Sequence, residues 1–443
     1  MSKQQVTEQA VVRCVPRLRF PEFRGAEGWA QMRLIDTTDR SIKWSFIGGP
    51  FGSNLKSSDY VPYGVRIIQL QNIGDGEFCN EYKIFTTLEK ANELLSNNIY
   101  PNDIIMSKMG DPVGRACLIP DDHDRYVMCS DGIRLVVDEK KNDKYFIYSL
   151  INSPLFRGAV DKTATGSTRK RIGLEELKNL PLWLPKKSEQ QRIAACLSSL
   201  DDLINAESQQ LTSLKTHKKG LMQQLFPREG ESVPRMRLPD FRNNGEWNIF
   251  PLAALAEKIM VGIASAATHA YRETGVPMLR NQNIKEGGVD DSSLLFIDPT
   301  YEATHKNKRL KAGDVITVRT GYPGLSAVIT NRYENAQCFT SLITRPKSDL
   351  LDSNYLCLYI NSPIGKKFML GAEAGGAQKN VNAGTLETLE VYLPQIEEQR
   401  KIASVFSNLD DLITAQAAYL DTLKQHKKGL MQQLFPSLDD RST

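Results

Sequence analysis

The sequence predicts an α/β protein with an internal duplication, in which two mixed α/β domains are joined by two long helices that form an antiparallel coiled coil. Three observations support this fold class. The segment HKKGLMQQLFP occurs at residues 217–227 and again at 426–436, within longer segments, 189–227 and 398–436, that are identical at 25 of 39 positions. Both copies repeat apolar residues every 3.5 positions over about five heptads. Short β-branched runs interrupted by Gly and Pro lie between the copies and indicate strands and turns.

Each repeated segment is expected to form one helix, and the two helices are expected to pair. The first helix delivers the chain to the second domain and the second helix begins there, so pairing along the whole seam requires an antiparallel arrangement. About 36 residues would give a rod of roughly 54 Å. The alternative is two amphipathic helices, each lying on its own domain. Glu207 and Lys218 interrupt the first apolar seam, and Gln416 and Lys427 interrupt the second. The expected seam residues are Ile193, Leu197, Leu200, Ile204, Leu211, Leu214, Leu221 and Leu225, and Ile402, Phe406, Leu409, Ile413, Leu420, Leu423, Leu430 and Leu434.

Further pairs of repeated motifs divide the chain into segments. VPRLRFPEFR and VPRMRLPDFR, which begin at residues 15 and 233, are each followed by a tryptophan, Trp29 or Trp247. INSP begins at residues 151 and 360, and LPLWLP at residue 180 faces LEVYLP at residue 389. We name residues 28–185 head 1 and residues 246–394 head 2. The expected order is an N-terminal segment (1–27), head 1, a helix (186–227), a linker (228–245), head 2, a helix (395–436) and a C-terminal tail (437–443).

The two heads share only a few short sequence motifs. GVRIIQLQNI at residue 64 faces GVPMLRNQNI at residue 275, and NDIIMSKMG at residue 102 faces GDVITVRTG at residue 313. We expect these runs to be strands, with helices at 144–151 and 355–360, but the order of the strands in the sheets is not predicted. The two helices are nearly identical in sequence, whereas the two domains differ over most of their length. This pattern is typical of a protein in which two equivalent supports carry two different binding surfaces.

Composition narrows the protein class. The 443 residues are 41% hydrophobic and 24% charged with a net charge of +4, so nucleic-acid contacts would have to come from local patches. The seven cysteines have no CxxC spacing, and the five histidines have no metal-like spacing, which predicts no structural zinc site and fits a reducing compartment. We find no apolar stretch of about 18 residues and no apolar leader, and therefore expect a cytoplasmic protein that does not enter a membrane.

These motifs, in this order and duplicated, resemble the specificity subunit of type I restriction–modification enzymes. The resemblance covers residues 15 to 436 and includes the RFPEF box, the GPFGS–LK stretch at 49–56 and the LDDLI and KKGLMQQLFP parts of the helices. It implies two target-recognition domains that read the halves of an asymmetric bipartite sequence in double-stranded DNA. It also implies two methyltransferase subunits as partners, two restriction subunits in the full complex, and no cofactor on this chain, because S-adenosylmethionine belongs to the methyltransferase.

Candidate DNA contacts follow from the chemistry of duplex recognition, which uses cations for phosphates and forked or amide side chains for base edges. Head 1 has a Gly/Ser/Thr loop, GSTRKRIG, beginning at residue 166, and head 2 has GGAQKNVNAG at the aligned position 375. The basic run HKNKRLK at 305–311 is a candidate phosphate contact. For all these segments the alternative is an ordinary solvated surface. The candidate residues are Lys108, Arg115, Arg169, Lys170 and Arg171 in head 1, and Lys308, Arg309, Arg319, Gln378, Lys379 and Asn380 in head 2.

No catalytic residues are predicted. GGPFGSNLKSS at 48–58 lacks the order of a nucleotide-binding loop, and its counterpart at 261–270 loses the PFG element. A loose nuclease-like pattern at Pro120, Asp121, Glu139 and Lys141 occurs in one head alone. We find neither an Asn/Asp-Pro-Pro-aromatic box nor a convincing Gly-rich cofactor loop, so the chain is not expected to methylate DNA by itself. The alternatives to a specificity subunit are a free-standing DNA-modifying enzyme and a coiled-coil scaffold without sequence-specific DNA binding.

The paired lysines of the HKKG segments leave two interpretations open. Each helix carries a cationic band near its end, formed by Lys218 and Lys219 in the first helix and by Lys427 and Lys428 in the second. Such a band complements the negative C-terminal end of a helix dipole. Alternatively, it helps to anchor a methyltransferase subunit or the DNA backbone.

Overall fold

The computed structural model describes residues 13–228, 230–265, 267–286, 288–373, 381–436 and 441–442. The chain divides into two compact units: unit 1 comprises Met1–Ala206 and Leu420–Thr443, and unit 2 comprises Glu207–Tyr419. Each unit therefore contains one head and the adjoining parts of both long helices. Within the described parts, no helix combines the length and the apolar character that a membrane span requires.

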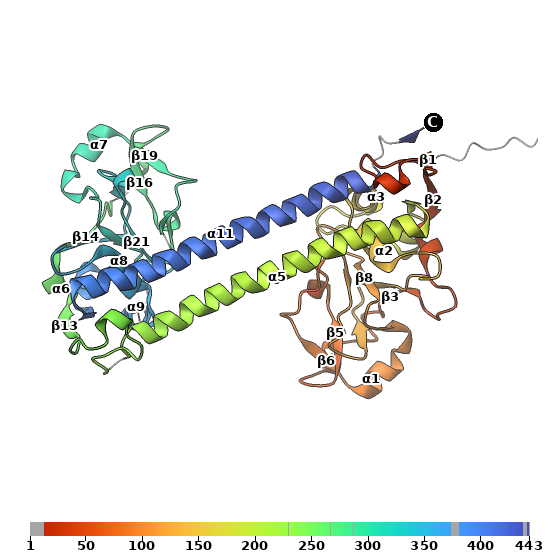
Figure 1. Cartoon of the computed structure of the whole chain (residues 1–443), viewed down its shortest axis with the longest axis horizontal. Helices are drawn as coiled ribbons and strands as arrows, with labels where there is room; N and C mark the ends of the chain where they lie inside the picture. Colours follow the sequence, from red (N-terminus) through yellow and green to blue (C-terminus); the bar gives the residue numbers. More distant parts are fainter. Residues whose placement is uncertain are drawn as a thin grey trace, which may run out of the picture. The chain divides into compact units, whose positions relative to one another are not determined.

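The long helices α5 (Lys187–Leu225) and α11 (Ile396–Leu434) have 39 residues each. Within each unit they lie side by side and run in opposite directions (Figure 1). In unit 1 the start of α5 packs with the end of α11, and in unit 2 the end of α5 packs with the start of α11. All the seam residues expected from the 3.5-residue spacing are buried or partly buried. The antiparallel coiled coil is confirmed.

The polar residues that interrupt the seam meet polar partners on the other helix. Lys218 donates from Nζ to Asp410 Oδ1 at 2.6 Å in unit 2, and Lys427 donates to Asp201 Oδ1 at 2.5 Å in unit 1. Because each lysine and each aspartate has a counterpart 209 positions away, one interaction is built twice. Gln416 donates from Nε2 to Glu207 Oε2 at 2.6 Å. A polar residue in an apolar seam stabilises one register over others, because a shifted register would leave it unpaired.

Head 1 contains two sheets that position its surface loops. Their strand orders are β3-β11-β8-β9 and β4-β6-β5-β10-β7, and a further sheet, β12-β2-β1-β25, lies in unit 1. The strands are β1 (Arg13–Cys14), β2 (Trp29–Arg33), β3 (Phe46–Gly48), β4 (Tyr60–Val61), β5 (Val65–Ile68), β6 (Ile84–Thr86), β7 (Asn98–Ile99), β8 (Ile104–Ser107), β9 (Ala116–Leu118), β10 (Tyr126–Met128), β11 (Gly132–Leu135), β12 (Pro181–Leu184) and β25 (Arg441–Ser442).

Head 2 repeats this arrangement. Its sheets have the orders β14-β23-β20-β21 and β15-β19-β16-β22, with two-stranded β13-β24 and β17-β18 beside them. The strands are β13 (Asn248–Pro251), β14 (Ala256–Val261), β15 (Tyr271–Arg272), β16 (Val276–Leu279), β17 (Ile284–Lys285), β18 (Gly288–Val289), β19 (Leu295–Ile297), β20 (Val315–Thr317), β21 (Ser326–Val328), β22 (Gln337–Cys338), β23 (Leu342–Pro346) and β24 (Glu390–Leu393).

The correspondence between the heads extends to strand direction. β5 pairs in parallel with β10 in head 1, as β16 does with β22 in head 2, while the neighbouring pairs are antiparallel. Two domains with few identical residues therefore share one mixed fold. The short helices are α1 (Leu88–Glu93), α2 (Lys144–Ile151), α3 (Pro154–Thr163), α4 (Leu174–Lys178), α6 (Leu252–Leu255), α7 (Pro299–Ala303), α8 (Ser353–Asn361), α9 (Pro363–Glu373) and α10 (Ala383–Glu387).

The repeated INSP segments join two helices to a hairpin in each head. Ser153 caps α3 through its hydroxyl, and Pro154 occupies the first turn, where its missing N–H costs nothing. The Asn152 amide exchanges hydrogen bonds with the backbone N–H and carbonyl of Ala116 at the start of β9. Asn361 forms the same two bonds with Ser326 at the start of β21. INSP is thus repeated because it positions the β8–β9 and β20–β21 hairpins.

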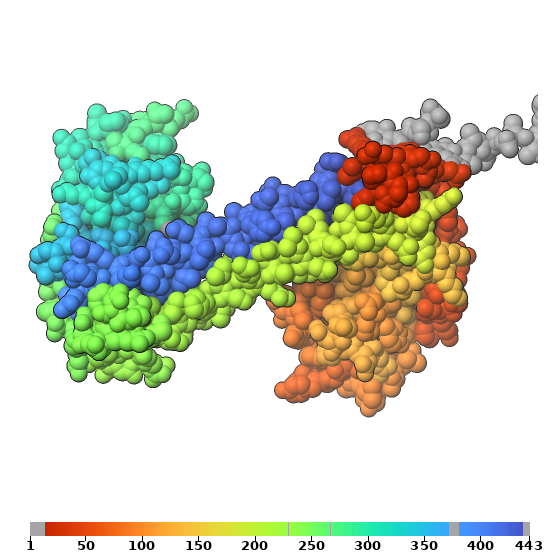
Figure 2. Space-filling model, viewed as in Figure 1, coloured from red at the N-terminus to blue at the C-terminus, as the bar shows by residue number. Residues whose placement is uncertain are grey.

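The repeated N-terminal boxes anchor the chain to the start of each long helix. Arg19 forms a two-pronged ion pair with Glu189 at 2.8 and 2.7 Å, and both side chains are more than 90% buried. Trp29 also donates from Nε1 to Glu189 Oε1 at 3.2 Å. Arg237 binds Glu398 in the same way in unit 2. In Figure 2 the first described residues, in red, cover the helix ends of unit 1.

Candidate nucleic-acid interface

In head 1 the hairpin between β8 and β9 lies against the loop that follows α3. The backbone N–H of Ile172 donates to the carbonyl of Lys108 at 3.0 Å, and the N–H of Gly110 donates to the carbonyl of Lys170 at 3.1 Å. Met109 and Arg171 form a β-bridge, as do Thr165 and Arg171. The structure therefore brings Lys108 together with the Arg169–Lys170–Arg171 run, which are distant in sequence.

The cations of this surface remain open to solvent. Lys170 pairs with Asp161 and Arg171 with Asp131, both at 2.6 Å, but the two cationic side chains are 40% and 51% exposed. Arg169 is exposed. Exposed ion pairs contribute little to stability, so a phosphate can compete for such cations. Arg115, on the same hairpin, is half-buried and its Nε has no hydrogen-bond partner among the described residues.

In head 2 the hairpin between β20 and β21 occupies the corresponding place. The N–H of Val381 donates to the carbonyl of Arg319, as that of Ile172 does to Lys108. Arg319 is therefore the structural counterpart of Lys108, and its Nε also has no partner within the described residues. Gln378, Lys379 and Asn380 lie outside the described residues, so their contribution stays a prediction.

Lys308 and Arg309 differ from the other candidates because their charged groups bind within head 2. Lys308 donates from Nζ to the carbonyl of Gly262 at 2.8 Å. Arg309 forms a two-pronged pair with Glu302 at 2.7 and 2.6 Å, and this hydrogen bond lowers the pKa of the Glu302 carboxyl. Glu302 is 2% exposed, so Arg309 neutralises a buried charge. These contacts favour a role for both residues in the fold of head 2.

Sequence reasoning missed three exposed aromatic side chains. Phe51 is 81% exposed, Tyr63 is 87% exposed and Tyr322 is 82% exposed. Tyr322 lies at the tip of the β20–β21 hairpin between Gly321 and Gly324, whose positive φ angles of 85° and 91° suit glycine. Head 1 has Asp111 and Pro112 in this turn. An aromatic residue within a Gly-Pro turn was the available signal, because such a turn leaves the ring nothing to pack against.

The described residues include no group of three or more His, Cys, Asp or Glu side chains that could hold a metal ion. The chemistry of the candidate surface is that of cations, amides and aromatic rings on rigid hairpins. Two heads of one fold, which present different side chains at corresponding hairpins, define a protein with two related but unequal recognition domains.

This chain belongs to the type I restriction–modification DNA specificity family. The family described as "Type I restriction modification DNA specificity domain" matches it twice, over residues 51–216 and 244–425. The chain is 25% identical over 349 residues to the type I restriction enzyme MjaVIII specificity subunit of Methanocaldococcus jannaschii, covering 75% of this chain and 78% of the relative. It is 21% identical over 415 residues to the EcoKI specificity subunit of Escherichia coli, covering 90% and 84%.

Solved structures agree with the fold. The S subunit of a type I restriction–modification system from M. genitalium matches with a TM-score of 0.55 at 16% identity, covering 96% of this chain and 100% of the other. A chain from a type I R-M system, solved in relation to complex assembly and conformational transition, matches with a TM-score of 0.57 at 16% identity, covering 92% and 98%. At this identity the match establishes the fold.

Proposed function

We propose that this chain supplies the DNA specificity of a type I restriction–modification complex, with each head reading one half of an asymmetric bipartite target. The observation that carries this proposal is the pair of corresponding hairpins: both are fixed by the same Asn-to-backbone hydrogen bonds, yet one carries Lys108 and Asp111 and the other Arg319 and Tyr322. Equal scaffolds with unequal side chains suit the reading of two unlike half-sites.

The chain acts without catalysis of its own. Its partners are two methyltransferase subunits and, in the full complex, two restriction subunits, and the methyltransferases hold S-adenosylmethionine. Each methyltransferase acts on an adenine that must leave the base stack for the reaction. The paired helices set the nonspecific spacer between the half-sites. Family membership and the duplication support these roles, because two similar docking surfaces suit two copies of one partner.

Exchange of head 1 tests the proposal directly. Replacing residues 28–185 with the corresponding head of another family member is expected to change one half of the methylated motif and to leave the other half intact. The readout is sequencing of adenine methylation in cells that carry all three subunits. The matched experiment replaces residues 246–394 and should change the opposite half. A change in both halves, or in neither, contradicts the two-head assignment.

Tyr322 is expected to contribute to recognition by head 2. Substitution Tyr322→Ala should weaken binding of the assembled complex to its target about 10- to 100-fold, which corresponds to about 1–3 kcal/mol for one lost base contact. The thermal midpoint should not change, because the ring is 82% exposed. Tyr419→Ala, which removes a 47% exposed ring from α11 outside the heads, is the control. Equal DNA affinity for Tyr322→Ala and wild type would exclude the contact.

A further inference from the structure

The two heads have one exposed glutamine in common at corresponding positions, Gln71 in head 1 and Gln282 in head 2. Each belongs to a Gln-Asn-Ile motif on the 3₁₀ turn that follows strand β5 or β16, at Leu70–Asn72 and Asn281–Asn283. The heads differ over most of their length, so an identical motif calls for a physical reason at each of its three positions.

The asparagine and the isoleucine of the motif are explained by the fold. Asn72 and Asn283 are buried, and each closes its turn by accepting a hydrogen bond from the backbone N–H three residues earlier, at 2.8 and 2.9 Å. Each also donates to a backbone carbonyl seven residues further along the chain, at 2.8 and 2.9 Å. Ile73 and Ile284 are buried in the cores of their heads. These contacts hold the two turns in one conformation.

The glutamine of the motif has no comparable role in the fold. Gln71 is exposed, and its side chain makes no hydrogen bond to any of the described residues. Gln282 is also exposed, and its Nε2 donates to the Ser293 hydroxyl at 3.2 Å on the surface. An exposed amide adds little to stability, because water binds it equally well in the unfolded chain. The identity of this position therefore indicates a contact outside the chain that each head makes once.

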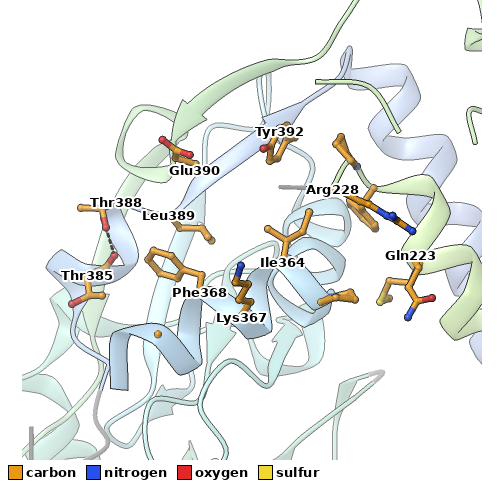
Figure 3. Close-up of a pocket in the computed structure, with 15 residues that line it drawn as sticks. Gln223, Arg228, Ile364, Lys367, Phe368, Thr385, Thr388, Leu389, Glu390 and Tyr392 are labelled. Atoms are coloured by element: carbon orange, nitrogen blue, oxygen red, sulfur yellow. Dashed lines mark hydrogen bonds between the residues drawn. The ribbon is translucent and has the colours of Figure 1, made fainter. Parts of the chain in front are cut away.

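Identical exposed glutamines also occur in the long helices, but there the identity is less informative. Gln223 and Gln432 are such a pair, and Figure 3 shows Gln223 at a cavity of about 890 Å³ that Lys367 and Phe368 of α9 also line. The helix segments that contain this pair are identical at 25 of 39 positions. In the heads, by contrast, overall similarity does not explain an identical exposed residue.

In head 1 the turn that carries Gln71 lies at the same end of the domain as the β8–β9 hairpin. Strands β5 and β10 pair in parallel and end together, at Ile68 and Met128. The chain after Ile68 forms the turn. The chain after Met128 reaches Asp131, whose carbonyl accepts a hydrogen bond from the N–H of Lys108 at 2.7 Å. Gln71 is therefore on the side of head 1 that carries the candidate cations.

Head 2 places Gln282 in the same way. Strands β16 and β22 also pair in parallel and end together. Asn281, next to the glutamine, donates from Nδ2 to the Thr320 hydroxyl at 2.9 Å, and Thr320 follows Arg319 in the β20–β21 hairpin. Both glutamines thus lie near hairpins whose own side chains differ between the heads.

We infer that Gln71 and Gln282 each bind a phosphate group of the DNA backbone, one in each half-site. This inference rests on the proposed function. Two unlike half-sites differ in their base edges, whereas the sugar–phosphate backbone is the same in both. An amide that both heads retain beside side chains that differ suits this common part, and its Nε2 group donates to a phosphate oxygen. Such contacts fix the position of a protein on the duplex and carry no sequence information.

The experiment measures DNA binding by the full chain assembled with the methyltransferase subunit of its own system. Two duplexes of equal length are used, one with the methylated motif and one without it. Gln71→Ala and Gln282→Ala should each weaken binding to both duplexes by the same factor, about 3- to 10-fold for one lost neutral hydrogen bond. The methylated motif should not change. The salt dependence of binding should also stay as in the wild type, because glutamine carries no charge.

Two further variants separate this contact from a structural role. Gln71→Glu replaces the donor by a carboxylate that repels phosphate, so affinity should fall further than with Gln71→Ala. Gln31→Ala is the matched control, because Gln31 is an exposed glutamine of head 1 on β2, in the sheet β12-β2-β1-β25. It should bind both duplexes as the wild type does.

Wild-type affinity in the folded Gln71 and Gln282 variants would overturn the inference. A loss confined to the duplex with the motif, together with a changed methylated motif, would also overturn it, because the glutamines would then read bases. If the wild-type complex binds the two duplexes equally, the proposed function itself fails, and the inference fails with it.

Discussion

Substitution Glu189→Ala is expected to destabilise unit 1 by about 3–5 kcal/mol, because it leaves the Arg19 guanidinium charged and buried without its partner. Arg19 is 6% exposed and Glu189 is 2% exposed. The measurement is urea unfolding of the full-length chain, monitored together with hydrogen exchange in the first turns of α5. In this variant, hydrogen exchange in the first turns of α5 should accelerate at a lower urea concentration than exchange in unit 2. The reason is that the ion pair attaches the N-terminal segment to this end of the helix.

Two variants control for this effect. Glu398→Ala removes the equivalent carboxylate in unit 2 and should cost about 1 kcal/mol less, because Trp29 donates to Glu189 whereas Trp247 Nε1 has no partner within the described residues. Glu22→Ala breaks the exposed pair with Arg192, whose side chains are 49% and 56% exposed, and should cost less than about 1 kcal/mol. A cost for Glu189→Ala no larger than that for Glu22→Ala would contradict the assigned role of the buried pair.

Reversal of one charge in the coiled coil should have the second large effect. Lys218→Glu places a carboxylate beside Asp410 and beside Glu286, whose Oε1 lies 3.7 Å from Lys218 Nζ. It is expected to destabilise unit 2 by about 2–3 kcal/mol, given that Lys218 is 13% exposed and Asp410 is 32% exposed. Adding Asp410→Lys restores an opposite-charge pair and should recover most of this loss. A double-mutant cycle on the urea midpoint measures the coupling.

The neighbouring residue gives a matched control. Lys219→Glu changes the same charge at an exposed position of the same helix and should leave the free energy of unfolding within about 0.5 kcal/mol of the wild-type value. Independent, additive effects of Lys218→Glu and Asp410→Lys would show that the two side chains do not specify the register. Each of the two lysine–aspartate pairs has a third group. In unit 2, Glu286 Oε1 lies 3.7 Å from Lys218 Nζ, and in unit 1, Asp201 also accepts a hydrogen bond from the Tyr145 hydroxyl, whose pKa is raised by burial.

The partners of the basic residues could not be predicted from the sequence. By composition alone, DNA contacts are predicted equally for Lys308 and Arg309, which lie in a basic run, and for Lys108 and Arg171, which lie near glycines. The structure separates them, because Arg309 neutralises buried Glu302 whereas Arg171 stays half exposed. These partners lie 7 and 40 positions away along the chain, and no local pattern indicates which carboxylate a cation will meet.

The duplication, the two helices and their apolar seams could be predicted from the amino-acid sequence, because these features depend on spacing along the chain and on the period of the helix. By contrast, the common strand order of the heads and the pairing of Lys218 with Asp410 appear only in the folded structure. Both features depend on contacts between segments that are far apart in sequence. Their geometry is set by packing of the whole unit and not by the preference of any one segment.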